Sequence, residues 1–209
     1  MIHEVFPVGP LQSNCSVVGD EASGEAMVVD PGADVERILD VVANHGLKVG
    51  QIVLTHAHID HVGGTMQLKR LTQAPVLLHS ADEKLLDQVG QQAAWLGMRA
   101  PDPVKVDRWL ADGDTVQVGG ISAKVLHTPG HTQGCVCLYF EAEEKLIAGD
   151  TLFAGSVGRT DLPGGDYDQL MASLRTKILP LPDAVEVTAG HGPMTYIGVE
   201  RGSNPFLQG

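Results

Sequence analysis

Residues 55–64 of the sequence read THAHIDHVGG and directly follow an apolar run that we expect to be a short buried strand. The stretch places His56, His58 and His61 within six residues, with Asp60 among them. Alternate side chains of an extended segment project to the same side, so His56 and His58 can bind one metal ion together. A helix that starts next would turn Asp60 and His61 toward a second ion. Imidazole and carboxylate ligands favour zinc, iron or manganese over calcium or magnesium.

Three further candidate ligands lie much later in the chain, each just after an expected strand. They are His131 in the run TPGHT, Asp150 in AGDT and His191 in GHG. The neighbouring glycines let the backbone approach a metal ion closely. Each position alone is more typical of an ordinary loop. Together with the histidine-rich motif, the three positions predict a site that holds a pair of metal ions.

Apolar periodicity predicts alternating strands and helices along the sequence. We expect strands at residues 2–8, 15–18, 26–29, 51–54, 76–79, 116–118, 121–126, 135–140, 145–148 and 185–188. We expect helices at residues 34–45, 62–71, 81–96 and 166–178 and a short one near Val199, whereas 150–165 is rich in glycine and typical of a loop. Because strands and helices are mixed rather than segregated, the predicted fold class is α/β, with two sheets and the helices outside. The length suits a single domain spanning residues 1–209.

Charge and composition argue against several classes of partner. The formal net charge is −12, whereas a nucleic-acid-binding protein needs a basic face to neutralise phosphates. The same charge disfavours docking on an anionic membrane. The first residues, MIHEVFPVGP, lack the basic start and long apolar run of a signal peptide, and no apolar stretch approaches the roughly 20 residues that a membrane span needs. We therefore expect a cytoplasmic enzyme, either a monomer or a small homo-oligomer, that acts on a small molecule.

The cysteines do not form a recognisable redox or zinc motif. Cys15, Cys135 and Cys137 are few and odd in number, and the last two are separated by one residue instead of the two of a CxxC pair. We expect them to be buried free thiols, which is typical of a reducing compartment.

The histidine-rich stretch resembles the signature of the metallo-β-lactamase fold, an αββα four-layer sandwich. The runs HTPGHT at 127–132, GDTLF at 149–153 and GHG at 190–192 are similar to the glyoxalase II branch of that fold. The resemblance covers nearly the whole chain. It implies that one ion is bound by His56, His58 and His131, that the other is bound by Asp60, His61 and His191, and that Asp150 bridges them.

The resemblance also implies an activity, which is hydrolysis of the thioester of an S-acylglutathione such as S-lactoylglutathione. We hypothesise two divalent ions, with zinc favoured over iron or manganese, and a bridging hydroxide as the nucleophile. Asp60 would be catalytic as well as a ligand, because it can accept a hydrogen bond from the hydroxide and orient it. A thiolate leaves without a general acid, whereas an amide nitrogen must be protonated, and this favours a thioester over a lactam.

The sequence leaves alternatives open for the substrate and for several residues. The chain stops before the C-terminal helical region that helps glyoxalase II bind glutathione, so it resembles the short bacterial type. The loop GRTD at 158–161 resembles that of persulfide dioxygenases, so a mononuclear iron glutathione persulfide dioxygenase is the main alternative. A non-catalytic metal-binding module is a third reading.

Arg159 is the candidate for binding a substrate carboxylate, although it could equally be a surface arginine or pair with Asp161. For Asp30, a turn and a contact to a metal ligand are comparably favoured. We expect His79 and His127 to be structural, although His127 could instead contact a metal ligand.

Overall fold

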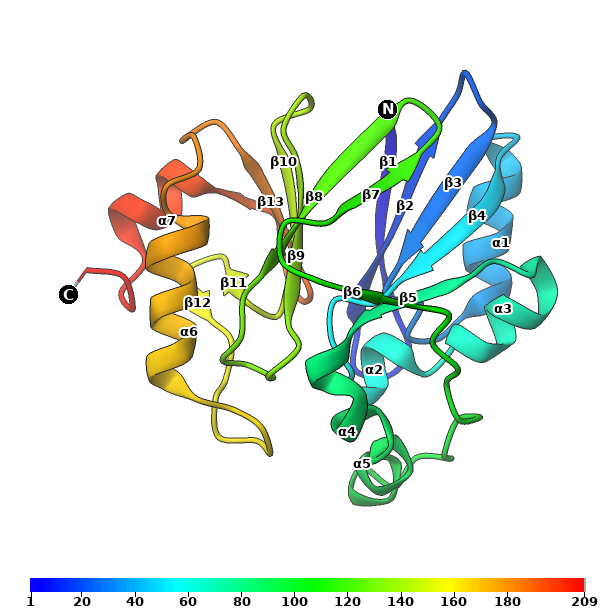
Figure 1. Ribbon diagram of the computed structural model, residues 1–209, viewed down its shortest axis with the longest axis horizontal. Helices are drawn as coiled ribbons and strands as arrows, with labels where there is room; N and C mark the ends of the chain where they lie inside the picture. The colour runs from blue at the N-terminus through cyan, green and yellow to red at the C-terminus, as the bar shows by residue number, and fades with distance from the viewer. Residues whose placement is uncertain (209) are drawn as a thin grey trace.

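Two facing β-sheets with helices on their outer sides form the fold (Figure 1). The structure is a computed structural model that describes residues 1–208. Each main sheet has six strands, and the layers follow the order helix, sheet, sheet, helix. The predicted αββα four-layer sandwich is therefore confirmed.

The first sheet is built from the N-terminal part of the chain in sequence order. Its strands are β1 (Ile2–Val8), β2 (Ser13–Asp20), β3 (Glu25–Val29), β4 (Lys48–Val53), β5 (Val76–His79) and β6 (Arg108–Leu110). The first three strands pair antiparallel and the last four pair parallel. The carboxyl ends of β3, β4 and β5 consequently lie at one edge of the sheet.

The second sheet has the strand order β14-β13-β10-β9-β8-β7. Its strands are β7 (Thr115–Val118), β8 (Ile121–His127), β9 (Val136–Phe140), β10 (Lys145–Gly149), β13 (Glu186–Ala189) and β14 (Thr195–Tyr196). A separate hairpin is formed by β11 (Leu152–Phe153) and β12 (Ser156–Val157).

Helices cover the outer face of each sheet. The first sheet carries α1 (Val35–Asn44), α2 (Ile59–Val62), α3 (Thr65–Thr72), the 3-10 turn η1 (Ser80–Asp82), α4 (Glu83–Leu86) and α5 (Val89–Trp95). The second carries α6 (Tyr167–Ser173), which continues as the π-helical turn η2 (Leu174–Ile178), and α7 (Ile197–Ser203). No helix among residues 1–208 is both long and apolar enough to cross a membrane.

Strands β3, β9 and β10 are buried on both faces, so their side chains alternate between two layers of core. In β3, Val28 packs with the helices of the first sheet, whereas Met27 and Val29 point into the space between the sheets. In β9, Leu138 points between the sheets and Cys137 points toward the helices of the second sheet. This period of two is why β-branched and aliphatic runs, rather than polar alternation, mark these strands.

Several expected elements have different boundaries in the structure. The helix expected at 62–71 begins later, as α3 at Thr65, and a separate short helix α2 precedes it. Between the two helices, Gly64 N donates 2.8 Å to the carbonyl of Pro31, and Gly63 packs against the backbone of Gly32. The helix expected at 81–96 is divided among η1, α4 and α5. Strand β6 was not expected, and hairpin β11–β12 lies within the expected loop at 150–165. The cysteines are buried and free, as expected.

Candidate metal centre

The structure brings all the predicted ligands to one edge of the two sheets. His56 and His58 follow β4, and Asp60 and His61 lie on the short helix α2. The other three ligands come from the second half of the chain, where each follows the carboxyl end of a strand, and they are His131 after β8, Asp150 after β10 and His191 after β13. The loops that leave these strand ends therefore place residues that are far apart in sequence around one point.

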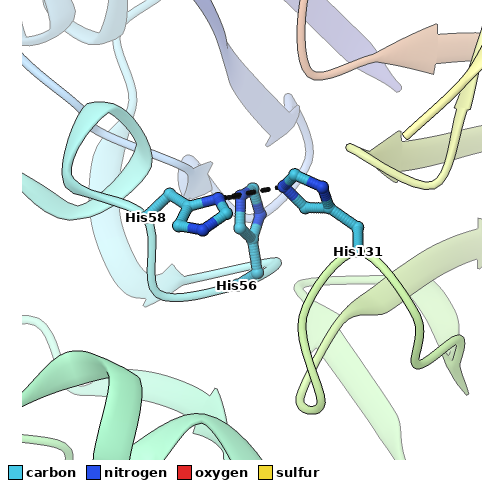
Figure 2. Close-up of side chains that lie close together, drawn as sticks. All are labelled: His56, His58 and His131. Carbon is cyan, nitrogen blue, oxygen red and sulfur yellow. Dashed lines mark hydrogen bonds between the residues drawn. The ribbon is translucent and has the colours of Figure 1, made fainter. Parts of the chain in front are cut away.

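The first group consists of His56, His58 and His131, whose rings converge in Figure 2. His58 Nδ1 lies 3.1 Å from His56 Nε2 and 2.9 Å from His131 Nε2. One hydrogen on His58 Nδ1 can be donated to only one of these two Nε2 atoms. In the other pair of nitrogens, no hydrogen would then lie between the two atoms to form a hydrogen bond. A shared cation removes that conflict, because nitrogens at 2.0–2.1 Å from one tetrahedral ion are roughly 3.3 Å apart. The first group thus fits a metal ion.

The second group consists of Asp60, His61 and His191. Asp60 Oδ2 lies 3.1 Å from His191 Nε2 and 3.5 Å from His61 Nε2. His61 is completely buried, whereas His191 is partly exposed. One carboxylate oxygen and two imidazole nitrogens therefore face a common position.

Asp150 lies between the two groups and faces both. Its Oδ2 is 3.4 Å from His131 Nε2 and 3.8 Å from His191 Nε2, and its Oδ1 is 3.5 Å from His61 Nε2. A carboxylate in this position can bridge two ions, one in each group.

Within residues 1–208, two buried polar atoms in the centre have no hydrogen-bond partner. They are His61 Nε2 and Asp150 Oδ1, and each is shielded from solvent. Burying polar atoms without partners costs stability, so each such atom needs an explanation, and a bound ion is one. Both are metal-ligand atoms that face the same space, and a cation satisfies both. The donor set of imidazoles and carboxylates fits zinc, iron or manganese.

A chain of hydrogen bonds on the side away from the centre orients the imidazoles of His56 and His61. Thr55 Oγ1 donates to Asp30 Oδ2 at 2.6 Å and accepts from His56 Nδ1 at 3.0 Å. Asp30 Oδ2 also accepts from His61 Nδ1 at 2.9 Å. Because these Nδ1 atoms carry the ring hydrogens, the Nε2 lone pairs of His56 and His61 point into the centre. Asp30, for which the sequence left two roles open, both adopts a left-handed turn conformation (φ 53°) and holds a candidate ligand.

His131 is oriented in the same way by the main chain. Its Nδ1 donates to the carbonyl oxygen of Arg159 at 2.7 Å, which leaves Nε2 free to face the first group. The loop that carries Arg159 is thereby tied to the metal centre.

Asp82 joins the loops of the two halves and was not identified from the sequence. This buried carboxylate of η1 accepts hydrogen bonds from Ala57 N (2.9 Å), Thr132 Oγ1 (2.8 Å) and Gly134 N (2.6 Å). Ala57 lies between His56 and His58, and Thr132 follows His131. Burial raises the pKa of Asp82 above its usual value. No local sequence pattern predicts this role, because the groups that donate hydrogen bonds to Asp82 come from segments far away in the sequence.

Close packing at Gly190 explains why glycine precedes His191. A Cβ at Gly190 would overlap Asp150 Oδ1 and would lie 2.9 Å from the His61 ring. The backbone after β13 can therefore approach Asp150 only without a side chain at this position.

The pKa values differ sharply between the two groups. Burial and the neighbouring histidines lower the pKa of His56 well below its usual range, and that of His58 to about 3. Burial also opposes a charge on His61, but Asp150 and Asp30 outweigh it and raise the pKa of His61 to about 10. The imidazoles of His56 and His58 are thus neutral, whereas the carboxylates of Asp30, Asp60 and Asp150 around His61 favour a positive charge at that place, which a bound cation can supply in place of a proton.

A cavity of about 650 Å³ opens above the ligands. His58, Asp60, His131, Asp150 and His191 lie in its floor. The rest of the lining is largely apolar, and Arg159 also faces it. The Arg159 guanidinium pairs with Asp161 through two contacts of 2.7 Å, and both side chains are exposed.

The two histidines that the sequence assigned a structural role lie outside the metal centre. His79 and His127 stack with ring centroids 3.9 Å apart and planes inclined by 13°. His127 Nε2 donates to the carbonyl oxygen of Gln133 at 2.8 Å, and no contact joins it to a candidate ligand within residues 1–208.

A family model described as the metallo-beta-lactamase superfamily matches residues 8–191, a span that contains every candidate ligand. An uncharacterized protein of Aquifex aeolicus is 48% identical over 99% of this chain and 97% of its own length. The hydroxyacylglutathione hydrolase GloC of Haemophilus influenzae is 40% identical over 98% of this chain and 97% of its own length.

Two solved structures are similar over almost the whole fold. The BLEG-1 B3 metallo-beta-lactamase superposes with a TM-score of 0.93 at 38% identity and covers 100% of both chains. The protein TTHA1623, in a di-iron-bound form, superposes with a TM-score of 0.88 at 40% identity and covers 96% of this chain and 98% of its own.

Proposed function

Because the chain belongs to the metallo-beta-lactamase superfamily, we propose that it is a metal-dependent hydrolase that cleaves the thioester of an S-acylglutathione such as S-lactoylglutathione. The observation that carries the proposal is the convergence of two ligand groups, with Asp150 between them, on the floor of one cavity. The hydroxyacylglutathione hydrolase of Haemophilus influenzae, similar along nearly its full length, supports the choice of substrate.

In this proposal the two groups hold two divalent ions. His56, His58 and His131 hold one ion, Asp60, His61 and His191 hold the other, and Asp150 contacts both. Zinc suits these ligands, and the di-iron form of a 40% identical structure makes iron a second candidate, with manganese a third. When bound, such ions lower the pKa of water toward 7 and polarise a substrate carbonyl.

Asp60 is the proposed catalytic residue of the chain. Burial opposes its ionisation, but the hydrogen bond with His191 and the charge of His61 hold its pKa below the usual range. It therefore stays an acceptor at neutral pH, and its carboxylate faces both the second group and the cavity. From there it can orient a nucleophilic water by accepting one of its hydrogens.

The titratable groups of the cavity favour a thioester over an amide. Every titratable side chain in the lining is a candidate ligand except Arg159, whose guanidinium does not act as an acid at neutral pH. The described lining therefore offers no free side-chain acid to protonate an amide nitrogen. A thiolate has no such requirement, because its conjugate acid has a pKa of about 8.5.

Arg159 is the proposed contact for a carboxylate of the thiol carrier. It is the cationic side chain in the cavity wall other than the histidines, within the part of the chain that is described. Its present partner Asp161 is exposed, and such pairs contribute only about 0–1 kcal/mol, so a substrate carboxylate can replace Asp161 at small cost.

Metal quantitation of the purified protein, combined with a rate measurement on S-lactoylglutathione, tests the proposal. We expect two metal ions per chain, thioester cleavage, and loss of turnover after treatment with a chelator that is reversed by adding metal. The variant Asp60→Ala should lower kcat/KM at least about 100-fold. The exposed Asp40→Ala on α1 is the matched control and should keep the wild-type rate.

Other outcomes identify the competing activities. One iron per chain with oxygen uptake on glutathione persulfide would support the dioxygenase instead. Faster turnover of a β-lactam than of any thioester would support the activity named for the similar BLEG-1 structure. Hydrolysis by Asp60→Ala at the wild-type rate with metal bound would contradict the assigned site.

A further inference from the structure

The cavity above the metal centre has two walls of different chemistry. One wall comes from α4 and α5 and contributes Leu85, Trp95 and Leu96. The opposite wall comes from hairpin β11–β12 and the loop that follows, and it contains Phe153 and Arg159. Figure 1 shows α4 and α5 below the first sheet and the hairpin beneath the second.

The wall formed by α4 and α5, the helical wall, has no charged side chain in the cavity lining. Its polar members are Gln88 and Gln92. The amide of Gln92 is committed to the main chain, since it accepts from Ile59 N at 2.8 Å and donates to the Ala57 carbonyl at 3.2 Å. The helical wall therefore offers apolar surface directly beside the residues that hold the metal centre.

Large apolar side chains at the rim of this wall are left in water. Trp95 is 67% exposed and Leu96 is 49% exposed, and Leu11 is also exposed at the cavity. Single exposed apolar residues are common, but here they are contiguous with an apolar cavity. An apolar group bound at this place would remove both surfaces from water.

Among the described residues that line the cavity, Arg159 is the one that carries a guanidinium, and its position orients the substrate. Arg159 follows the hairpin in the second half of the fold, whereas Trp95 ends α5 beside the first sheet, so the carboxylate-bearing thiol carrier belongs on the side away from Trp95. With the scissile carbonyl at the ligand groups, the acyl chain then extends along the helical wall. Building on the proposed thioester hydrolysis, we infer that this wall is an acyl-chain subsite that selects thioesters of apolar acyl groups longer than lactoyl.

The subsite has room for such a chain. The cavity volume of about 650 Å³ is in the range that encloses drug-sized molecules. Burying each further methylene contributes roughly a fourfold gain in binding. S-Lactoylglutathione gains little from the wall, because its short acyl group carries a hydroxyl and ends in one methyl group.

A homologous series of acetyl-, butyryl- and hexanoylglutathione tests the inference on the metal-loaded enzyme, because the thiol carrier is constant. We expect kcat/KM to rise from acetyl to hexanoyl by about fourfold per methylene until the wall is covered. Trp95→Ala should lower kcat/KM for hexanoylglutathione about tenfold and leave acetylglutathione unchanged, whereas Trp95→Phe should retain most of the gain. Trp109→Ala, an exposed tryptophan on β6 outside the cavity, is the matched control.

Binding of non-hydrolysable thioethers separates this inference from the proposed function. S-Hexylglutathione should bind the metal-loaded protein more tightly than S-methylglutathione, and Trp95→Ala should abolish the difference. If no thioester is hydrolysed but this difference appears, the proposed reaction fails and the apolar subsite stands. Equal affinities, a flat or falling kcat/KM along the acyl series, or an equal loss for acetyl and hexanoyl in Trp95→Ala would overturn the subsite.

Discussion

At the scale of single residues, the orientation of three candidate imidazole ligands is set by the ring nitrogen that faces away from the centre. His56, His61 and His131 each use Nδ1 for a hydrogen bond to Thr55, Asp30 or the Arg159 carbonyl. These bonds fix the tautomer and the ring orientation before any ion arrives. Metal affinity should therefore depend on residues that never touch a metal.

Removing the Thr55 hydroxyl tests this dependence. Thr55→Val deletes both the acceptor for His56 and the donor to Asp30, so we expect metal affinity to fall about 10–100-fold. Competition with a chromophoric chelator measures the affinity. Thr65→Val is the matched control, because the Thr65 hydroxyl is buried without a partner and its loss should leave metal affinity unchanged. Equal affinities of the two variants would contradict the orienting role.

The pair formed by Arg159 and Asp161 gives a second test at this scale. If Arg159 binds the substrate carboxylate, Arg159→Ala should raise KM for S-lactoylglutathione up to about tenfold with little change in kcat, because uniform binding is lost. Asp161→Asn frees the guanidinium and should lower KM or leave it unchanged. Steady-state kinetics of both variants decide the matter. A similar rise in KM in both variants would mean that the pair only holds the loop.

Sequence patterns predicted the candidate ligands well, but they did not predict the residues whose hydrogen bonds hold the ligand loops in place. The ligands sit in short motifs at strand ends, so their gathering follows from the fold class. Asp82 and Gln92 act through bonds to segments remote in sequence, such as Ala57 and Gly134, and no periodicity signals such bonds.

At the scale of elements, the interrupted helices are the main departure from expectation. Apolar spacing predicted one helix at 81–96, but the chain forms η1, α4 and α5 in succession. The interruption places Asp82 inward at the start, where its carboxylate reaches the loops that carry His56 and His131. Tertiary hydrogen bonds of this kind override local helix preference, which is why the boundary was not predictable.

Truncation of Asp82 should weaken the connection between the two loops. Asp82→Ala leaves three buried donors without an acceptor, and we expect the free energy of unfolding to fall by about 3 kcal/mol. Asp82→Asn should lose less, because one acceptor oxygen remains. Urea denaturation of the metal-loaded protein measures the change. The exposed Asp87→Ala in the same segment should stay within about 0.5 kcal/mol of wild type, and a similarly small effect for Asp82→Ala would refute the connection.

At the scale of the whole molecule, the two sheets also meet at the stacked rings of His79 and His127. These residues end β5 in the first sheet and β8 in the second. Burial and the neighbouring His127 lower the pKa of His79 to about 4, with Lys177 acting in the same direction and Asp112 and Asp114 opposing it. The contact between the sheets is therefore made by a neutral His79.

This neutral ring predicts an acid-sensitive contribution to stability. The folded-state pKa lies below the ordinary histidine value of 6.5, so the contribution is present above pH 6.5 and is lost as the pH falls toward 4. His79→Phe keeps an aromatic ring against His127 without binding a proton. We expect the wild-type unfolding free energy to decline more steeply than that of the variant between pH 6.5 and 4. Parallel declines in urea titrations across this range would show that His79 does not carry the effect.

The division of the ligands between the two sheets has a consequence for biosynthesis. A nascent chain that has emerged from the ribosome only as far as β6 carries His56, His58, Asp60 and His61 but lacks His131, Asp150 and His191. The first ligand group is complete once His131 and the shared Asp150 have been made, whereas the second is complete only when His191, after β13, has been made and docked. Binding of both proposed ions would thus be a late event that requires correct assembly of both halves, and a shortage of metal in the cell would leave folded chains without their ions.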